Sequence, residues 1–312
     1  MIWHSTGFGI EQQGTQILQT EGGIAAQRFV PQIQCAEDVE KIKMPVVTVD
    51  RHATAARLAA MQEVFAGILP VKLQGVKHYW FTPWDNLIRW YGVEEAMVDL
   101  VERPELVNAA VARVVDACLV ELDQMAALDL LELNNDNTRI GSGGYGYTDE
   151  LPGPTWDGRT IEPQHMWGCS NAQIFVGVSP EMHWEFALRH EMRWLQRWGL
   201  TYYGCCEPLD QKLEILRRIP NLRKISMSAW IDPSRAAEAV GTDYVFSYKP
   251  SPAVLAEDQW NVEKARLHKV LETVKGCRVE VILKDISTVR GQPQRLWEWE
   301  KMAMALVRSM GA

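Results

Sequence analysis

The chain has 312 residues, a formal net charge of −8 and a sequence pI near 5.5. An acidic chain without a basic cluster has no field to attract polyanions, which excludes nucleic acid as a partner. Six scattered cysteines, no signal-peptide pattern and no apolar run of the roughly 18 residues that a membrane span requires predict a cytoplasmic protein without membrane contact.

The lead-in, residues 1–65, is rich in Gly and Gln, and its best strand is residues 46–49, so we expect it to be irregular. From residue 66 onward, short aliphatic runs alternate with amphipathic segments, which is typical of repeated βα units in an α/β fold. The predicted strands are residues 70–73, 128–133, 200–205, 224–228, 244–248 and 278–283. The predicted helices are residues 85–101, 104–127, 180–198, 209–218, 234–240, 262–275 and 293–310. No linker or repeat divides the chain, so we expect residues 1–312 to form one domain.

A long segment, residues 134–161, follows the second predicted strand. It contains the sequence GSGGYG at residues 141–146, which matches the G-x-G-x-x-G motif of dinucleotide sites. The motif is not followed by a helix, because Pro152 comes soon after it, and this argues against a dinucleotide site. We interpret the segment as a loop over a pocket, with Asn135 and Asp136 as candidate substrate-binding residues or as simple turn residues.

The predicted strand at residues 200–205 leads directly into Cys205, Cys206 and Glu207. Ligands of parallel α/β folds bind at the carboxyl ends of the strands, and thiolates with a carboxylate are typical zinc ligands. Free cysteines are also often buried as packing residues, and neighbouring side chains of a strand point in opposite directions. The alternatives at this strand end are therefore a metal site and a packed pair of cysteines.

Two later strands also end in ionisable residues, Lys249 and Asp285. We predict that they orient substrate, transfer protons or support a metal, the alternative being a plain ion pair. Trp84 and Tyr203 are candidate substrate-binding aromatics, although large aromatic residues more often fill a core. His183 and His190 share a charged helix, for which we expect a solvated face.

Three segments in chain order carry a family resemblance: GILPVKL at residues 67–73, FTPW at residues 81–84 and DLVERPEL at residues 99–106. They resemble the strand, Pro-containing loop and helix-Pro-Glu pattern of the uroporphyrinogen decarboxylase (URO-D) superfamily, from about residue 37. The resemblance implies a TIM-like (β/α)8 barrel with its first two strands missing or replaced. The open edges of such a barrel need covering, which a partner subunit in a homo-oligomer would provide.

Within the superfamily, the chain resembles the zinc-dependent methyltransferases that work with corrinoid proteins. That branch has His-x-Cys at a strand end. Cys205 matches this Cys, Tyr203 stands in place of the His, and Lys284-Asp285 stands where a later Cys is expected. The resemblance implies zinc held by Cys205 with Cys206 and Glu207 as substitute ligands.

The implied activity is methyl transfer between a small methylated compound and a corrinoid protein or a thiol. The arginine-rich N-terminal signature of the decarboxylase is missing. Two alternatives stay open: a metal-free decarboxylase-like enzyme, in which Arg139 and Lys249 bind substrate carboxylates, and a non-catalytic barrel that binds a flat ligand or a corrinoid partner.

Overall fold

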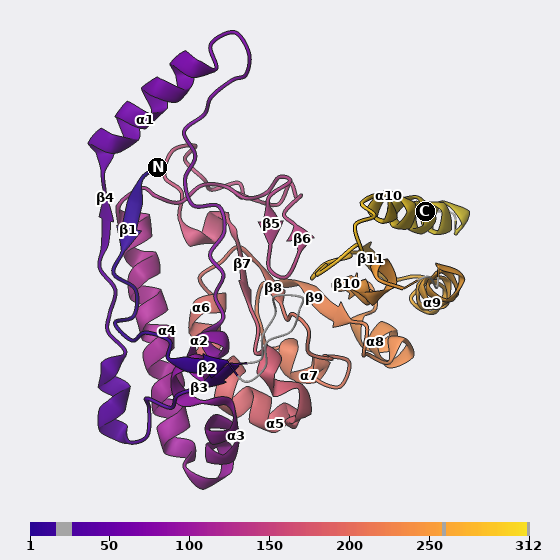
Figure 1. Cartoon of the computed structure of the whole chain (residues 1–312), viewed down its shortest axis with the longest axis horizontal. Helices are drawn as coiled ribbons and strands as arrows, with labels where there is room; N and C mark the ends of the chain where they lie inside the picture. The colour runs from indigo at the N-terminus through magenta and orange to yellow at the C-terminus, as the bar shows by residue number, and fades with distance from the viewer. Residues whose placement is uncertain (17–26, 258–259, 311–312) are drawn as a thin grey trace.

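The computed structural model describes residues 1–16, 27–257 and 260–310, and a parallel sheet lies at its centre (Figure 1). Each strand of this sheet pairs with the next one along the chain, in the order β11-β10-β9-β8-β7. The strands are β7 (Trp167–Ser170), β8 (Leu200–Tyr203), β9 (Leu222–Ser228), β10 (Val245–Lys249) and β11 (Arg278–Val281). The predicted α/β class with a parallel sheet is confirmed.

Helices precede the sheet in the chain, connect its successive strands and follow its last strand. They are α1 (Arg51–Val64), α2 (Pro83–Tyr91), α3 (Val93–Glu102), α4 (Pro104–Ala127), α5 (Pro180–His183), α6 (Arg189–Leu195), α7 (Leu213–Leu216), α8 (Pro233–Val240), α9 (Trp260–Thr273) and α10 (Gln294–Ser309). α4 has the predicted bounds, because Pro104 suits a first helical position and apolar residues recur along one face.

Three helix predictions differ from the structure. The helix expected at residues 85–101 is two helices, because Gly92 adopts a φ of 90° between α2 and α3. The one at residues 180–198 contains a π-helical turn (Trp184–Leu188) between α5 and α6. The helix expected at residues 209–218 is reduced to α7.

The sheet continues beyond β7 through isolated contacts rather than full strands. Val76 and Leu131 form a single parallel bridge, and Asn134 exchanges hydrogen bonds of 2.8 and 3.0 Å with the backbone of Trp167. The strand predicted at residues 70–73 is absent and the one at residues 128–133 reduces to this bridge. Among the described residues, a complete barrel is therefore not formed, and β11 lies at an edge of the sheet.

Residues 1–65 are more regular than expected, although residues 17–26 lie outside the described part. They contain α1 and two antiparallel pairs, β1 (Trp3–Ser5) with β4 (Val47–Val49) and β2 (Gly14–Gln16) with β3 (Gln27–Phe29). β4 matches the strand expected there. No helix in the described ranges is long and apolar enough to cross a bilayer.

The predicted loop at residues 134–161 contains a small hairpin, β5 (Arg139–Ile140) with β6 (Gly144–Tyr145). At its turn Gly141 has a φ of 50°, and a Cβ at this position would lie 2.3 Å from the ring of Tyr202 on β8. Only glycine allows this close approach. The hairpin thereby brings Ser142 to the carboxyl end of β8.

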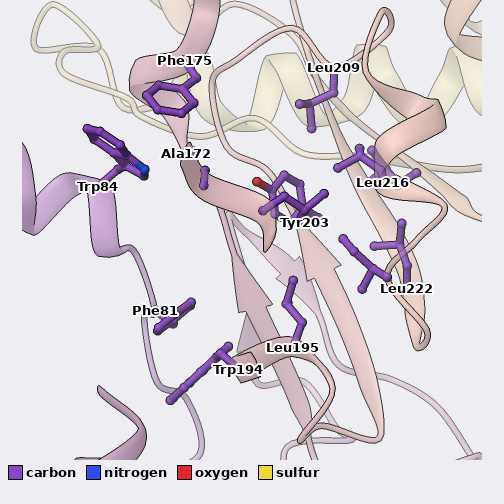
Figure 2. Packing of buried hydrophobic residues seen from close by; sticks show 14 of the residues in the cluster. Phe81, Trp84, Ala172, Phe175, Trp194, Leu195, Tyr203, Leu209, Leu216 and Leu222 are labelled. Atoms are coloured by element: carbon purple, nitrogen blue, oxygen red, sulfur yellow. The ribbon is translucent and has the colours of Figure 1, made fainter. Parts of the chain in front are cut away.

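The core that supports β8 is rich in aromatic residues (Figure 2). Phe81 stacks on Trp194 with ring centroids 4.3 Å apart, and Trp84 packs on Phe175 at 4.5 Å. Trp84 is 0% exposed, and its indole Nε1 donates to the carbonyl of Phe186 at 2.9 Å. This packing holds the sheet end rigidly beneath the site described next.

Candidate functional site

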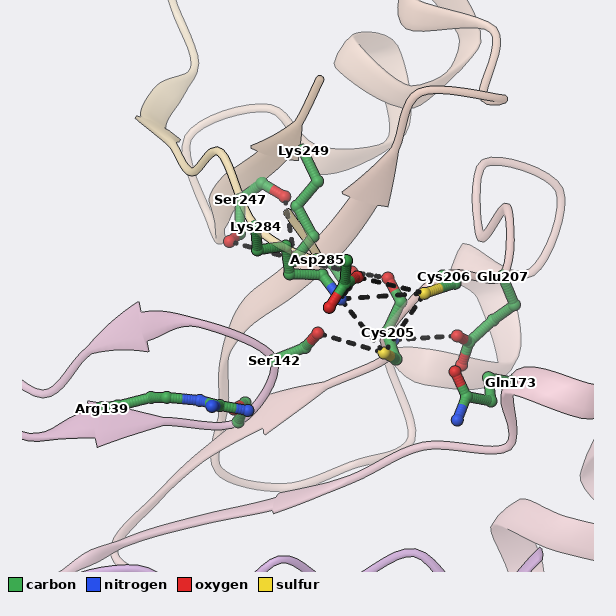
Figure 3. A network of polar contacts seen from close by, with 12 residues as sticks. Arg139, Ser142, Gln173, Cys205, Cys206, Glu207, Ser247, Lys249, Lys284 and Asp285 are labelled. Atoms are coloured by element: carbon green, nitrogen blue, oxygen red, sulfur yellow. Dashed lines mark hydrogen bonds and ion pairs between the residues drawn. The ribbon is translucent and has the colours of Figure 1, made fainter. Parts of the chain in front are cut away.

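The two adjacent cysteines lie just beyond β8 and face each other (Figure 3). Gly204 follows the last strand residue with a φ of 97°, and a Cβ there would lie 2.5 Å from Leu209 and 2.9 Å from Ser226. The glycine turns the chain and ends the alternation of side chains that a continuing strand would impose. As a result, the sulfur atoms of Cys205 and Cys206 lie 3.5 Å apart instead of on opposite faces.

Two further segments bring polar groups to these sulfurs. The hydroxyl of Ser142 donates to the Sγ of Cys205 at 3.1 Å, from the β5–β6 hairpin. The Nζ of Lys284, beyond β11, lies 3.5 Å from the Sγ of Cys205 and 3.7 Å from that of Cys206. Lys284 also pairs with Asp285 at 2.5 Å, and the Asp285 carboxylate lies 3.8 Å from the Sγ of Cys206.

These contacts give the two cysteines different acidities. The thiol of Cys206 donates to Cys205, and with the Ser142 hydroxyl and the Lys284 ammonium this lowers the pKa of Cys205 below its ordinary value of 9.0. The pKa of Cys206 is raised, first by its hydrogen bond to Cys205 and then by burial, with the nearby Asp285 carboxylate acting in the same direction. The negative charge therefore resides on Cys205, and Cys206 stays a thiol.

Lys249 lies behind the thiols at the end of β10 and is only 4% exposed. Its ammonium donates to the Tyr202 hydroxyl, to the Oγ of Ser226 at 2.7 Å and to the Ser247 carbonyl at 3.4 Å. Ser226 in turn donates to the carbonyl of Cys205 at 2.5 Å. Burial, and then the charge of Lys284, lowers the pKa of Lys249 to about 7, so this amine exchanges protons near neutral pH.

The thiols and both lysines line one pocket of about 90 Å³. The residues that complete its wall are Ser228, Ala229, Trp230, Pro250, Ser251, Pro252 and Asp285. Trp230 is 77% exposed at the rim, and it also lines two neighbouring depressions of about 470 and 670 Å³. The reactive groups thus lie in a small recess, and Trp230 at its rim separates it from two wider depressions that form an entrance beside it.

The donors in this recess do not fit a zinc ion. The carboxylate of Glu207 is buried and accepts from the backbone N–H of Cys205 at 2.8 Å instead of joining the thiols, and burial raises its pKa to about 7. The Lys284 ammonium lies against both sulfurs, where a metal would bind. In the part of the chain that the structure describes, no three His, Cys, Asp or Glu side chains are grouped to hold a metal. Zinc stays a prediction from the family resemblance, and no step below depends on it.

Tyr203 lies in a buried polar cluster, on the face of β8 opposite to that of its neighbour Tyr202. Its hydroxyl lies 2.7 Å from the Nε2 of His183, and the Nζ of Lys212 lies 3.1 Å from the Nδ1 of the same ring. Glu191 is also fully buried. The solvated face expected around His183 is therefore wrong, because this face of the α5–α6 segment packs against the sheet.

Glu191 makes the stability of the protein depend on pH. Burial raises the pKa of its carboxyl to about 8 from an ordinary value of 4.5, so between these values the unfolded chain releases a proton that the folded chain keeps. The contribution of this carboxyl to the free energy of unfolding should therefore fall as the pH rises through this window. We expect Glu191→Gln to remove this contribution, and urea unfolding of the variant and the wild type from pH 5 to 9 measures the difference between their slopes. The exposed Glu214→Gln is the control, and an unchanged slope in Glu191→Gln would contradict the prediction.

The other predicted site residues lie elsewhere. The side-chain amide of Asn135 donates to the Leu151 carbonyl at 2.8 Å, and the carboxylate of Asp136 pairs with Lys77 at 2.7 Å, so both brace the long loop. Trp84 and Tyr203 lie in the core. The structure thus brings four predicted residues to one pocket: Cys205, Cys206, Lys249 and Asp285.

Sequence reasoning missed three residues of the site. Ser142 lies in the glycine-rich GSGGYG segment, whose glycines were the available signal for a close backbone approach. Lys284 precedes Asp285 at the same strand end, so the same argument could have selected it. Trp230 carries no signal in the sequence beyond its place shortly after a strand.

No protein-family model matches the chain, and no curated protein matches it. Among solved structures, it is similar to a methyltransferase from Methanosarcina mazei, with a TM-score of 0.44 and 10% sequence identity. The match covers 83% of this chain and 64% of that one, so the chain spans less than two thirds of the length of that protein.

Proposed function

We propose that this chain is a methyltransferase in which the Cys205 thiolate accepts a methyl group from a small methylated compound. The observation that supports this is the set of contacts on one sulfur: a hydroxyl donor, a thiol donor and an ammonium, within 3.1 to 3.5 Å. They stabilise a thiolate, which is the nucleophilic form of cysteine. Cys206 carries no charge of its own and serves as a hydrogen-bond donor.

The transfer is a displacement at carbon. An electron pair of the Cys205 thiolate forms a bond to the methyl carbon while the bond from that carbon to its leaving group breaks. The leaving group departs with the electron pair and takes a proton from Lys249, whose pKa near 7 suits a general acid at neutral pH. The products are an S-methyl cysteine at position 205 and the protonated leaving group.

A corrinoid protein is the proposed partner for the onward transfer, because a thioether gives up its methyl group only to a very strong nucleophile. The recess of about 90 Å³ is far below the size of ordinary ligand pockets, so it does not fit a corrinoid ring. The proposal accordingly places the corrinoid on a separate protein, and we derive no step through it. The wider entrance beside Trp230 is the face that would meet such a partner.

The test is incubation with isotopically labelled methylamines, methyl sulfides and methoxy compounds, followed by mass spectrometry of the peptide that contains Cys205. We expect one labelled methyl group on Cys205, and none in Cys205→Ser. Zinc is measured by elemental analysis of the same samples. If the chain holds one zinc that is lost in Cys205→Ser, the metal-free mechanism is overturned. If Cys205 stays unmodified with every donor, the proposed methyl transfer is overturned.

Lys284 should set the acidity of the nucleophile. Replacing it with Gln removes the ammonium from both sulfurs and should raise the pKa of Cys205 by about 1. Ultraviolet absorbance of the thiolate, followed against pH, measures this change directly. Lys301→Gln, an exposed lysine on α10, is the matched control. If the Cys205 titration does not move in Lys284→Gln, the ammonium does not stabilise the thiolate.

A second candidate, decarboxylation of a carboxylated substrate, is favoured by the two lysines that line the recess. Lys249 and Lys284 would bind the carboxylates, while Arg139 lies on the hairpin with its guanidinium 5.7 Å from the ring of Trp80. Release of carbon dioxide from a panel of carboxylated pyrroles and keto acids, without methylation of Cys205, would select this function over the first.

A further inference from the structure

We infer that Cys205 and Cys206 form a redox modification site that reacts with a low-molecular-weight disulfide and closes to a vicinal disulfide. The inference does not depend on methyl transfer, because it concerns the reactivity of two thiols in any enzyme that carries them. It goes beyond the proposed function, in which Cys206 only donates a hydrogen bond.

The geometry supports closure of the pair. The two sulfurs lie 3.5 Å apart, and a disulfide requires about 2.05 Å, so the sulfurs must approach each other by about 1.5 Å to form the bond. Cys206 is exposed, whereas Cys205 is buried at the base of the recess. An incoming disulfide therefore approaches through the open side of the pocket, and both thiols line the wall that it meets.

Lys284 lies within 3.7 Å of both sulfurs and can stabilise the charge on each in turn. This matters because the reaction has two steps with a thiolate in each one. The carboxylate of the neighbouring Asp285 lies 3.8 Å from the Sγ of Cys206 and can receive the proton that this thiol loses. The site thus holds a nucleophile, a second thiol, a cation and a proton acceptor around one pair of sulfurs.

The proposed reaction is a thiol–disulfide exchange in two steps. The Cys205 thiolate attacks one sulfur of a disulfide such as oxidised glutathione, forms a mixed disulfide and releases one glutathione thiolate. Cys206 then loses its proton and attacks the Sγ of Cys205, which releases the second glutathione thiolate. Two cysteine thiols are oxidised to one disulfide, and one glutathione disulfide is reduced to two thiols.

The closed form should be reversible. Neighbouring Cα atoms are 3.8 Å apart across a trans peptide bond, which is shorter than the usual Cα separation in a disulfide. The resulting strain makes such a bond easy to reduce, as in labile regulatory disulfides. Closure removes the thiolate from Cys205, so the reaction at this sulfur stops until the disulfide is reduced.

The test treats the full chain with oxidised glutathione and records the intact mass, then maps the modified peptide. In the wild type, the peptide that contains Cys205 and Cys206 should lose two hydrogen atoms and retain no glutathione, with full recovery after dithiothreitol. Cys206→Ser should stop at the mixed disulfide and retain one glutathione on Cys205. Cys35→Ser, which removes an exposed cysteine of the lead-in, is the control and should close like the wild type.

Two results would overturn the inference: a wild-type chain that keeps glutathione on Cys205, or one in which both thiols remain open to alkylation. Circular dichroism of each variant confirms that it is folded. Methyl acceptance by Cys206→Ser is measured separately, by the labelling described above. A chain that is methylated on Cys205 but does not close therefore contradicts this inference alone, and a chain that closes without being methylated contradicts only the proposed function.

Discussion

Replacing Cys205 with Ala should abolish methyl acceptance, with a fall in rate of at least about 10³-fold, because the nucleophile is lost. In the wild type, the rate should rise with pH as Cys205 ionises below the ordinary thiol pKa of 9.0, and it should fall again as Lys249, the general acid with a pKa of about 7, loses its proton. Single-turnover kinetics with a labelled donor from pH 5 to 10 measures both effects.

The matched control for this variant is Cys277→Ser. Cys277 is half-buried between α9 and β11, and its thiol contacts the Ala237 carbonyl at 3.7 Å instead of the recess. This variant should keep the wild-type rate and pH profile. Residual methyl transfer in Cys205→Ala at more than a tenth of the wild-type rate would show that another group is the nucleophile.

Replacing Trp84 with Ala should lower the free energy of unfolding by about 3 to 5 kcal/mol, the usual cost of removing a large aromatic side chain from a core. Trp84 is fully buried against Phe175 and donates to the Phe186 carbonyl, so the change leaves a cavity and removes this hydrogen bond. Urea unfolding followed by circular dichroism gives the value.

Trp230→Ala is the natural comparison, because it removes the same side chain from an exposed position. Its free energy of unfolding should change by less than about 0.5 kcal/mol, as is usual at surfaces, while the KM for substrate should rise. A stable Trp84→Ala protein with an altered KM would instead support the substrate-binding role predicted from the sequence.

Much of the fold could be predicted from local patterns. Four strands, β8 to β11, were found within a few residues, because each is a run of aliphatic or aromatic residues bounded by turns. β7 was missed since Trp167-Gly168-Cys169-Ser170 has no β-branched residue. Gly168 is required there because a Cβ would lie 2.2 Å from the ring of Trp198, which is a tertiary constraint.

The site was only partly predictable for a similar reason. The carboxyl ends of parallel strands meet at one edge, which places Cys205, Lys249 and Asp285 together from the sequence alone. The direction of Cys206 could not be predicted, because it depends on the positive φ of Gly204, which the structure alone reveals. The role of Ser142 depends on how a distant hairpin packs on Tyr202, and no local pattern encodes such a contact.

The strand order has a consequence for the making of the protein. Lys284 lies 79 residues after Cys205, so at ordinary rates of synthesis it leaves the ribosome roughly 4 to 16 s after the thiols. Until β11 pairs with β10, the nascent cysteines have no ammonium beside them. The pKa of Cys205 is then higher than in the finished chain, because this ammonium is one of the groups that lower it. The Cys205 thiolate is therefore fully stabilised only once the last strand of the sheet is added.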